Sequence, residues 1–370
     1  MKKLLFIVNV DWFFISHRLP IALSALKQGF EVHIACALTD KREMLEKYGI
    51  IVHPLELSRS GVGLFSELKT LNSLYSIISS VQPDLTHCVT IKPVLYGNII
   101  ARFLKTSVRI SSISGLGYVF IANGFKAKLF RFFISSLYKL ALKNSQAVIF
   151  QNSSDRDVLK DLGALKEEQE VFIRGSGVDL NQYSVTREPA DDMVVMLIAR
   201  LLIDKGVNEF AQAAKIISSQ RSDIRMVLVG DADLENPKSI SPVQIRKWAD
   251  TGILEHWGYS HDVVRTIAQS NIMVLPSYRE GLPKSLVEAA ACGRAVITTD
   301  VPGCRDAIEP NETGLLVPSK STEELAEAII KLADNEPLRH ELASNGRKLA
   351  ESEFDINNVV AKHIEIYTRK

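Results

Sequence analysis

At about 150 residues per domain, a length of 370 residues suggests two domains. Hydrophobic residues make up 46% and charged residues 24%, which is ordinary for a globular chain and excludes a disordered, collagen-like or disulfide-scaffold protein. The formal net charge of +1 argues against a strongly basic nucleic-acid binder, so we expect no nucleic-acid partner.

The small total charge hides an uneven distribution. Residues 1–180 carry 22 basic and 15 acidic residues, whereas residues 181–370 carry 22 and 28. Between Asp84 and Asp155 lie 70 residues without an acid, and these include nine bases. Such asymmetry favours an anionic partner for the first half of the chain.

Short β-branched runs alternate with longer helical patterns along the whole chain. The expected strands of the first half are 4–8, 31–36, 51–55, 85–89, 108–111, 147–151 and 171–173. Those of the second half are 193–198, 226–229, 253–257, 272–275, 295–298 and 315–317. Helical patterns between them include 17–27, 65–79, 207–217, 262–269 and 323–332. This alternation predicts an α/β protein with one doubly wound parallel sheet in each half.

The segment 175–192 contains Gly and Pro without apolar periodicity and predicts the boundary between the two sheets. We therefore expect one domain over 1–178 and a second over 190–354, followed by a last helix over 356–367. Ligands of open parallel sheets bind at the carboxyl ends of the strands. For two facing sheets this predicts a site in an interdomain cleft.

The cysteines and the apolar segments of the sequence indicate the compartment in which the protein resides. Four scattered cysteines favour free thiols in a reducing compartment, and neither Cys nor His shows metal-ligand spacing, so we expect no metal site. No stretch approaches the roughly 20 apolar residues that span a bilayer, and the apolar start reads as a buried strand rather than a signal peptide. We expect a cytoplasmic protein.

The longest apolar region, 125–142, is also basic. On a helical wheel its bases fall within an arc of about 120°, namely Lys128, Arg131, Lys139 and Lys143. The opposite face carries Leu129, Phe130, Phe133, Leu137, Leu140 and Ala141. Two alternatives stay open: the helix lies on an anionic membrane or lipid phosphate, or it packs its apolar face on the sheet and leaves its bases in water.

The most informative segment is 275–293, a strand end followed by a turn and a helix of small residues. Pro283 suits the first turn of that helix, which places Glu280 in the preceding loop and Glu288 about two turns further on. Loop amides and a helix N-terminus favour an anion, and carboxylates there accept hydrogen bonds from hydroxyls. The alternative is a plain helix start at Glu280 and a partly exposed helix acid at Glu288.

Arg200 and Lys205 follow the first strand of the second half. A guanidinium fork and an ammonium suit a diphosphate, although two solvated surface charges are the alternative.

The first strand of the chain is not followed by G-x-G-x-x-G, which argues against a dinucleotide dehydrogenase. His17 and Arg18 are expected to open the first helix, and His17 is a candidate catalytic residue, with a structural role as the alternative.

Two further segments of the first half are candidates for ligand contact. His87, Thr90 and Lys92 are expected at the carboxyl end of a strand, where ligands bind. The loop 115–118 begins with Gly115, which needs a positive φ or a close backbone approach unless it is a plain tight turn.

In order and spacing, these motifs resemble the retaining glycosyltransferases with the GT-B fold of two facing Rossmann-like domains, including family 4. Glu280 and Glu288 match the family's E-x7-E motif, and Arg200 and Lys205 match its diphosphate-binding pair. The segments 177–179 and 275–277 resemble its "GVD" and "LPS" motifs. The resemblance implies that residues 355–370 cross back to the first domain. The first loop departs from the family, because Asp11-Trp-Phe-Phe stands where many members have a glycine pair, which questions the usual phosphate approach there.

Segments 90–93, 115–118 and 123–140 are more specifically similar to bacterial enzymes that extend sugars on undecaprenyl diphosphate, among them α-1,3-N-acetylgalactosaminyltransferases of O-antigen, capsule and protein-glycosylation pathways. The similarity implies a retaining, UDP-sugar-dependent hexosyltransferase at the cytoplasmic face of an anionic inner membrane, with front-face transfer and no metal or other cofactor. Glu280 would bind the donor sugar, Glu288 the ribose, and Arg200 and Lys205 the diphosphate. The remaining expected donor contacts are Gly281, Leu282 and Pro283. The expected acceptor and membrane contacts are Lys92, Gly115, Gly117, Tyr118, Lys126, Lys128 and Arg131.

Two other functions remain open at this point. The same fold hosts UDP-N-acetylglucosamine 2-epimerase, which converts a UDP-sugar without an acceptor. A non-catalytic module that binds a sugar nucleotide or a lipid is the other alternative.

Overall fold

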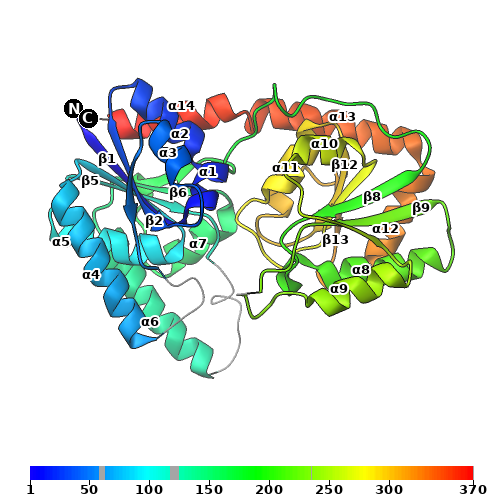
Figure 1. Cartoon of the computed structure of the whole chain (residues 1–370), viewed down its shortest axis with the longest axis horizontal. Coiled ribbons are helices and arrows are strands. Elements are labelled where there is room, and N and C mark those ends of the chain that lie inside the picture. Colours follow the sequence, from blue (N-terminus) through cyan, green and yellow to red (C-terminus); the bar gives the residue numbers. More distant parts are fainter. Residues whose placement is uncertain (58–62, 117–124, 235, 370) are drawn as a thin grey trace. The chain divides into compact units, whose positions relative to one another are not determined.

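The computed structural model describes residues 1–57, 63–116, 125–234 and 236–369, with the backbone alone at 64 and 125–132. The chain divides into two compact units (Figure 1). Unit 1 consists of Met1–Ser176 and Asn357–Lys370, and unit 2 of Gly177–Ile356. Most of the expected boundary segment 175–192 therefore belongs to unit 2, and the C-terminal residues belong to unit 1.

Unit 1 is built on a parallel sheet of seven strands in the order β3-β2-β1-β4-β5-β6-β7. The strands are β1 (Lys3–Val10), β2 (Glu31–Ala37), β3 (Ile51–Pro54), β4 (Leu85–Val89), β5 (Val108–Ile113), β6 (Ala147–Phe150) and β7 (Glu170–Phe172). Alternate residues of β1 enter different cores: Leu4 and Phe6 pack on one face of the sheet, and Leu5 on the other. The strand order reverses between β1 and β4, which makes the sheet doubly wound.

Helices cover both faces of this sheet. One face packs against α1 (Asp11–His17), α2 (Leu19–Lys27), α3 (Arg42–Lys47) and α14 (Ile356–Thr368). The other packs against α4 (Leu64–Val81), the π-helix η1 (Pro93–Gly97), α5 (Asn98–Phe103), α6 (Phe125–Leu142) and α7 (Ser153–Asp161). A short 3₁₀ turn, η3 (Glu167–Gln169), precedes β7.

Unit 2 has a parallel sheet of six strands in the order β10-β9-β8-β11-β12-β13. The strands are β8 (Met193–Ile198), β9 (Ile224–Val229), β10 (Glu255–Gly258), β11 (Ile272–Leu275), β12 (Ala295–Thr299) and β13 (Leu315–Val317). Its helices are α8 (Val207–Ser218), α9 (Pro242–Asp250), α10 (Val263–Ala268), α11 (Lys284–Ala291), α12 (Thr322–Asp334) and α13 (Glu336–Glu353), with 3₁₀ turns η4 (Ile203–Lys205) and η5 (Arg305–Ala307).

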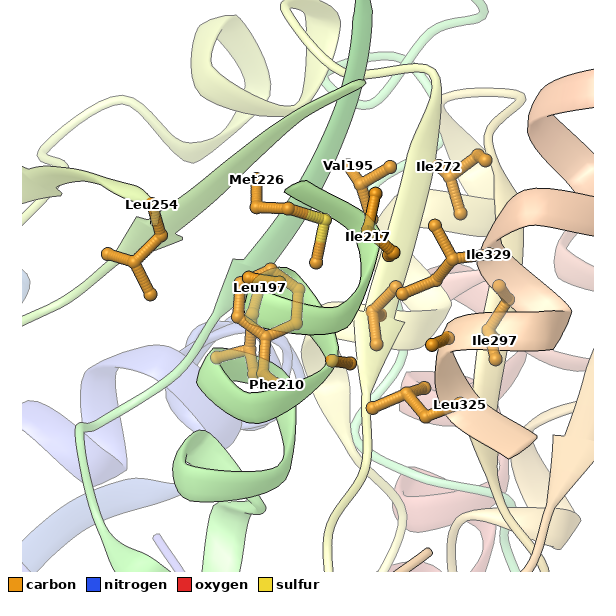
Figure 2. Close-up of a cluster of buried hydrophobic side chains, with 14 of the residues drawn as sticks. Val195, Leu197, Phe210, Ile217, Met226, Leu254, Ile272, Ile297, Leu325 and Ile329 are labelled. Atoms are coloured by element: carbon orange, nitrogen blue, oxygen red, sulfur yellow. The ribbon is translucent and has the colours of Figure 1, made fainter. Parts of the chain in front are cut away.

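The core of unit 2 explains why its sheet reads as continuous apolar runs. Figure 2 shows side chains of β8, β9, β11 and β12 meeting those of α8 and α12 in one buried cluster. Phe210 of α8 and Ile329 of α12 are fully buried there, and burial of such a side chain contributes about 1.5–3 kcal/mol. A strand covered on both faces needs apolar residues on both, which removes the polar alternation of a half-exposed strand.

The expected α/β architecture of two doubly wound parallel sheets is confirmed, and every expected strand overlaps an observed one. The first helix differs. The helix α1 begins at Asp11, directly after β1, and ends at His17, and Arg18 joins it to α2. His17 and Arg18 therefore do not open the first helix. Pro20 lacks an N–H and clashes with the preceding turn, which breaks one continuous helix into two.

The orientation of α6 also differs from the helical wheel. Its side chains are described from Phe133 onward, and the buried ones are Ser135, Tyr138, Ala141 and Leu142. Phe133 and Leu140 are exposed, beside the exposed Lys139 and Lys143. Of the two alternatives left open for this helix, the one in which the whole apolar face packs on the sheet would bury Phe133 and Leu140, and the structure leaves both exposed. The ring of Tyr138 occupies the core, and the residues three and four positions from it follow it inward.

Candidate active site

In unit 2, the loop after β8 packs directly against the loop after β11. Gly206 has φ +72° and is the N-cap residue directly before α8, and a Cβ at this position would lie 2.1 Å from the carbonyl oxygen of Pro276. The backbone N–H of Tyr278 donates to the carbonyl oxygen of Asp204 over 2.9 Å. Only glycine combines this φ with such a close backbone approach. The loop carrying Lys205 therefore lies directly against the loop carrying Glu280.

This contact brings Lys205 and Glu280 together. The Lys205 ammonium lies 2.5 Å from Oε1 of Glu280, and the Ser277 hydroxyl donates to the same oxygen over 2.7 Å. The backbone of Glu280 is also held, because its N–H donates to Pro302 and a Cβ at Gly303 would lie 2.3 Å from its carbonyl oxygen. Both side chains are mostly buried, so neither is a solvated surface charge.

Arg200, on the same loop as Lys205, engages a different carboxylate. Its Nη1 lies 3.2 Å from Oδ2 of Asp233, which follows β9. The guanidinium has five N–H donors in a planar fork, a geometry that suits carboxylates and phosphates. The sequence does not reveal Asp233, because nothing in the pattern after β9 indicates that its carboxylate faces the β8 loop.

Glu288 is buried in α11 and is not a partly exposed helix acid. Its Oε1 accepts a hydrogen bond of 2.7 Å from the Tyr183 hydroxyl and lies 3.1 Å from the Lys284 ammonium. Burial, and next the negative charge of Glu288, raise the pKa of Tyr183 well above its usual range, so the phenol stays a donor. Gly281, Leu282 and Pro283 are buried as well and form a packed entry to α11. Tyr183 lies 105 residues from Glu288, and no sequence motif connects the two.

In unit 1, the turn after the first strand, β1, is held by hydrogen bonds to the carboxylate of Asp11. The buried Asp11 accepts hydrogen bonds from the backbone N–H of Trp12 at 2.7 Å and of Thr39 at 2.6 Å, and from the Thr39 hydroxyl at 2.8 Å. A carboxylate thus occupies the N-terminal end of α1, where a phosphate would otherwise be favoured. This explains in physical terms why the chain lacks the glycine pair here.

His17 ends α1 and lies stacked on Phe13, with ring centroids 4.1 Å apart. Its Nδ1 lies 3.1 Å from the Phe13 carbonyl oxygen, which can only accept, so Nδ1 donates in this hydrogen bond. The neighbouring Arg18 is buried and donates to the His17 carbonyl oxygen and the Ser176 hydroxyl. Burial lowers the pKa of Arg18 to about 10.

Lys92 lies just beyond the carboxyl end of β4, as expected, and its ammonium lies 2.7 Å from Oε1 of Glu67. The turn begins with Thr90, whose φ of +76° is rare for a β-branched residue. Burial, and next the Glu67 carboxylate, raise the pKa of Tyr96 to about 12. A β-branched residue with a positive φ, such as Thr90, is strained, and strained residues concentrate at functional sites.

The structure corrects the expectation for His87. This residue lies inside β4, fully buried, and its ring nitrogens bond the Tyr367 hydroxyl at 2.6 Å and the Ser112 hydroxyl at 2.7 Å. It therefore joins the sheet to α14 and does not lie at the ligand-binding end of the strand.

Gly115 has the expected positive φ, at +109°. Gly117 and Tyr118 lie outside the described residues, as do the side chains of Lys126, Lys128 and Arg131. Within the described ranges, no group of three or more His, Cys, Asp or Glu side chains has the arrangement of a metal site. No helix in the same ranges has the length and apolarity needed to cross a bilayer.

Known protein families match both units of the chain. Residues 3–152 match the glycosyl transferase 4-like family, and residues 181–349 match the glycosyl transferases group 1 family. The chain is 31% identical over 95% of its length, and 94% of the relative's, to the N,N'-diacetylbacillosaminyl-diphospho-undecaprenol alpha-1,3-N-acetylgalactosaminyltransferase of Campylobacter jejuni. The chain belongs to the group 1 glycosyltransferases.

Two further comparisons involve proteins of lower identity to this glycosyltransferase. It is 23% identical to the UDP-Gal:alpha-D-GlcNAc-diphosphoundecaprenol alpha-1,3-galactosyltransferase of Escherichia coli, over 83% of this chain and 80% of that one. The crystal structure of Anabaena HepE in complex with UDP-glucose superposes with a TM-score of 0.78 at 17% identity, and all of both chains is covered. At that identity the superposition shows the fold alone. The GT-B fold and the family expected from the motifs are confirmed.

Proposed function

We propose that this glycosyltransferase moves a sugar from a UDP-sugar to a HexNAc-diphospho-undecaprenol, with retention of configuration, in the synthesis of O-antigen or a related surface polysaccharide. The best candidate for the transferred sugar is GalNAc, in α-1,3 linkage. The observation that carries the proposal is the contact between Lys205 and Glu280 at the carboxyl end of the unit 2 sheet. It is supported by the 31% identity to a relative named for this reaction type.

In this proposal unit 2 holds the donor. Arg200 and Lys205 neutralise the diphosphate, and their charge stabilises the leaving group as negative charge develops on it. Glu280 accepts hydrogen bonds from the donor-sugar hydroxyls, and Lys205 and Ser277 fix its carboxylate for that role. Glu288 accepts from the ribose, supported by the Tyr183 hydroxyl. Gly281, Leu282 and Pro283 form the floor of the donor site.

Retention follows from attack on the same face of the donor sugar that the diphosphate leaves. The bond between the anomeric carbon and the diphosphate oxygen breaks, and the bond to the acceptor oxygen forms. The acceptor's hydroxyl proton passes to the departing phosphate oxygen, so UDP itself acts as the base. His17, at the end of α1, is the candidate for positioning the acceptor hydroxyl.

Unit 1 holds the acceptor in this proposal. The strained turn with Lys92, and the loop from Gly115 through Gly117 and Tyr118, contact the acceptor sugar and diphosphate. Lys126, Lys128 and Arg131 of α6 attract the lipid diphosphate and the anionic cytoplasmic face of the inner membrane. The acid-free stretch between Asp84 and Asp155 gives this part of the chain the matching charge.

The test is a screen of purified chain against UDP-sugars, with GalNAc-diphospho-undecaprenol as the acceptor and product analysis by mass spectrometry and NMR. We expect UDP-GalNAc to yield UDP and an α-1,3-linked lipid-bound disaccharide. Conversion of a UDP-sugar without acceptor would support the 2-epimerase alternative instead. Tight UDP binding without turnover on any donor would support a non-catalytic module.

A further inference from the structure

The segment that follows β9 lies along the loop after β8, which carries Arg200. We call this segment the β9 strap: it consists of residues 231–240 and is described except at position 235. Its start is fixed by Gly230, which has φ +130° and where a Cβ would lie 1.9 Å from the Ala199 carbonyl oxygen. Only glycine permits so close a backbone approach. The strap therefore begins directly beside the residue that precedes Arg200.

Backbone hydrogen bonds hold both ends of the strap on this loop. The N–H of Leu201 donates to the Asp231 carbonyl oxygen over 3.1 Å, and the N–H of Ile240 donates to the carbonyl oxygen of Leu201 over 2.8 Å. The N–H of Ile203 donates to the Lys238 carbonyl oxygen over 2.9 Å. Because the backbone of the strap is attached to the loop in this way, its side chains have defined positions against the loop.

Two ion pairs of opposite direction join the strap to the loop. Arg200 of the loop pairs with Asp233 of the strap, with 3.2 Å between Nη1 and Oδ2. Lys238 of the strap pairs with Asp204 of the loop at 2.7 Å. The side chain of Asp233 is 16% exposed, whereas those of Lys238 and Asp204 are 40% and 38% exposed. Exposed ion pairs contribute little, so Asp233 is the carboxylate with the stronger effect on its partner.

The backbone of Asp233 is fixed within the strap. Its N–H donates to the Ser239 hydroxyl over 2.9 Å, and its carbonyl oxygen accepts from the N–H of Asn236 over 2.8 Å. Arg200, by contrast, has a side chain that is 46% exposed. A long side chain of this kind has many rotamers in water, and a fixed carboxylate beside it reduces their number. The ion pair therefore restricts the guanidinium to the carboxyl end of the unit 2 sheet.

We propose that Asp233 is a positioning residue that orients the Arg200 guanidinium for the diphosphate of the donor. Groups that are oriented before the reaction stabilise developing charge without reorganisation. Asp233 is negatively charged, so it acts through Arg200 and not by contact with the anionic diphosphate. The proposal rests on the proposed function, because it requires that Arg200 binds the diphosphate. It goes beyond that function by adding the β9 strap to the donor site.

The first experiment is a double-mutant cycle on the full chain, in which calorimetry measures the affinities for UDP and for uridine. Asp233→Ala is expected to lower the affinity for UDP by about 10-fold, because Arg200 then loses its rotamer freedom only when UDP binds. In a chain that carries Arg200→Ala, the same substitution should change the UDP affinity by less than about twofold. Uridine has no phosphate, so its affinity should be the same in Asp233→Ala and in wild type.

Two further variants separate positioning from stability. Asp233→Asn keeps an oxygen that accepts from the guanidinium, and should recover part of the lost UDP affinity. It also provides the second variant if Asp233→Ala lowers the melting temperature. The matched control is Lys238→Ala, which breaks the other ion pair between the strap and the loop and should leave the UDP affinity unchanged. Equal weakening of UDP and uridine in Asp233→Ala would show a general disturbance of unit 2 and overturn the proposal.

The remaining outcomes distinguish this proposal from the proposed function. Tighter UDP binding by Asp233→Ala would overturn the proposal, because it would show that the carboxylate competes with the diphosphate for Arg200. A loss of UDP affinity in Arg200→Ala but not in Asp233→Ala would refute this proposal alone. Wild-type UDP affinity in Arg200→Ala would refute the donor site of the proposed function, and the role of Asp233 with it.

Discussion

The two units share a doubly wound parallel sheet, yet they differ in the turn after the first strand. In unit 2, β8 leads into a loop with Arg200 and Lys205 that ends at the left-handed Gly206. In unit 1, β1 leads directly into α1, and the buried carboxylate of Asp11 occupies the helix start. The turn after the first strand of the sheet thus carries two cations in unit 2. In unit 1 it carries a carboxylate, which neutralises the positive N-terminal end of α1. A few residues of turn, and not the sheet, decide which unit suits a diphosphate.

The largest expected effect comes from removing the cation of the unit 2 turn. Lys205→Ala should lower transferase turnover by about 100-fold or more, because the leaving diphosphate loses a stabilising charge and Glu280 loses its partner. Steady-state kinetics with a UDP-sugar check this. Lys238→Ala is the matched control, because its ammonium pairs with Asp204 on the same loop, 2.7 Å away. Equal losses of turnover in both variants would show that the effect comes from the total charge of the loop and not from the position of Lys205.

The next effect tests the geometry of that turn. Gly206→Ala places a methyl group against the Pro276 carbonyl oxygen at a φ of +72°, and should destabilise unit 2 by about 3 kcal/mol. Gly252 has nearly the same φ, +69°, but a Cβ at this position would meet no heavy atom within 4 Å, so Gly252→Ala should cost only about 1 kcal/mol. Urea unfolding of both variants measures the difference. Equal costs would remove the close backbone approach from the explanation.

A second difference between the units is the burial of histidine. In unit 1, His87 of β4 and His363 of α14 are buried, whereas His256, His261 and His340 of unit 2 are at least partly exposed. Burial, and next the charge of Arg18, lower the pKa of His363 to about 3.

The unfolded chain takes up this proton near pH 6.5, whereas the folded chain does not, so stability falls as pH falls below that value. Between about pH 7 and about pH 5, one such histidine costs about 2 kcal/mol. The protection factors of amides in β4 and α14, which are corrected for the intrinsic exchange rate at each pH, should therefore fall in acid before those of the unit 2 sheet. His363→Gln should reduce this fall, and an unchanged pH dependence of the protection factors in this variant would contradict the assignment.

The smallest expected effect concerns the turn of unit 1. Asp11→Asn replaces one acceptor oxygen with a donor facing Thr39, and should destabilise unit 1 by about 1–2 kcal/mol. Its affinity for UDP, measured by calorimetry, should equal that of wild type, because the proposed function places the diphosphate in unit 2. A large loss of UDP affinity would show that the unit 1 turn contacts the nucleotide.

Much of this comparison is predictable from the sequence. The strands are readable because buried parallel strands are short β-branched runs, and the loop before α11 is readable from Pro283 and the small residues after it. The contact of Lys205 with Glu280 spans 75 positions and follows only from the family resemblance of their motifs. The apolar pattern does not predict the helix α1, although Asp11 in its first turn is a helix-start signal.

Other features depend on contacts that no local pattern encodes. The pairs Arg200–Asp233 and Tyr183–Glu288 join segments whose only connection is the folded sheet. The rotation of α6 differs from the alternative in which the apolar face of the helical wheel packs on the sheet, because the helix is apolar on more than one side. The bulk of Tyr138 determines which side is buried, and a helical wheel does not weigh one ring against several smaller side chains.

The central claim is that unit 2 activates a UDP-sugar for retaining transfer to a lipid-linked acceptor. The most direct measurement is a transfer reaction with UDP-GalNAc and GalNAc-diphospho-undecaprenol, with the anomeric configuration of the new linkage read by NMR. We predict an α-linked disaccharide from wild type and almost none from Lys205→Ala. A β linkage, or equal product from the two proteins, would contradict the account.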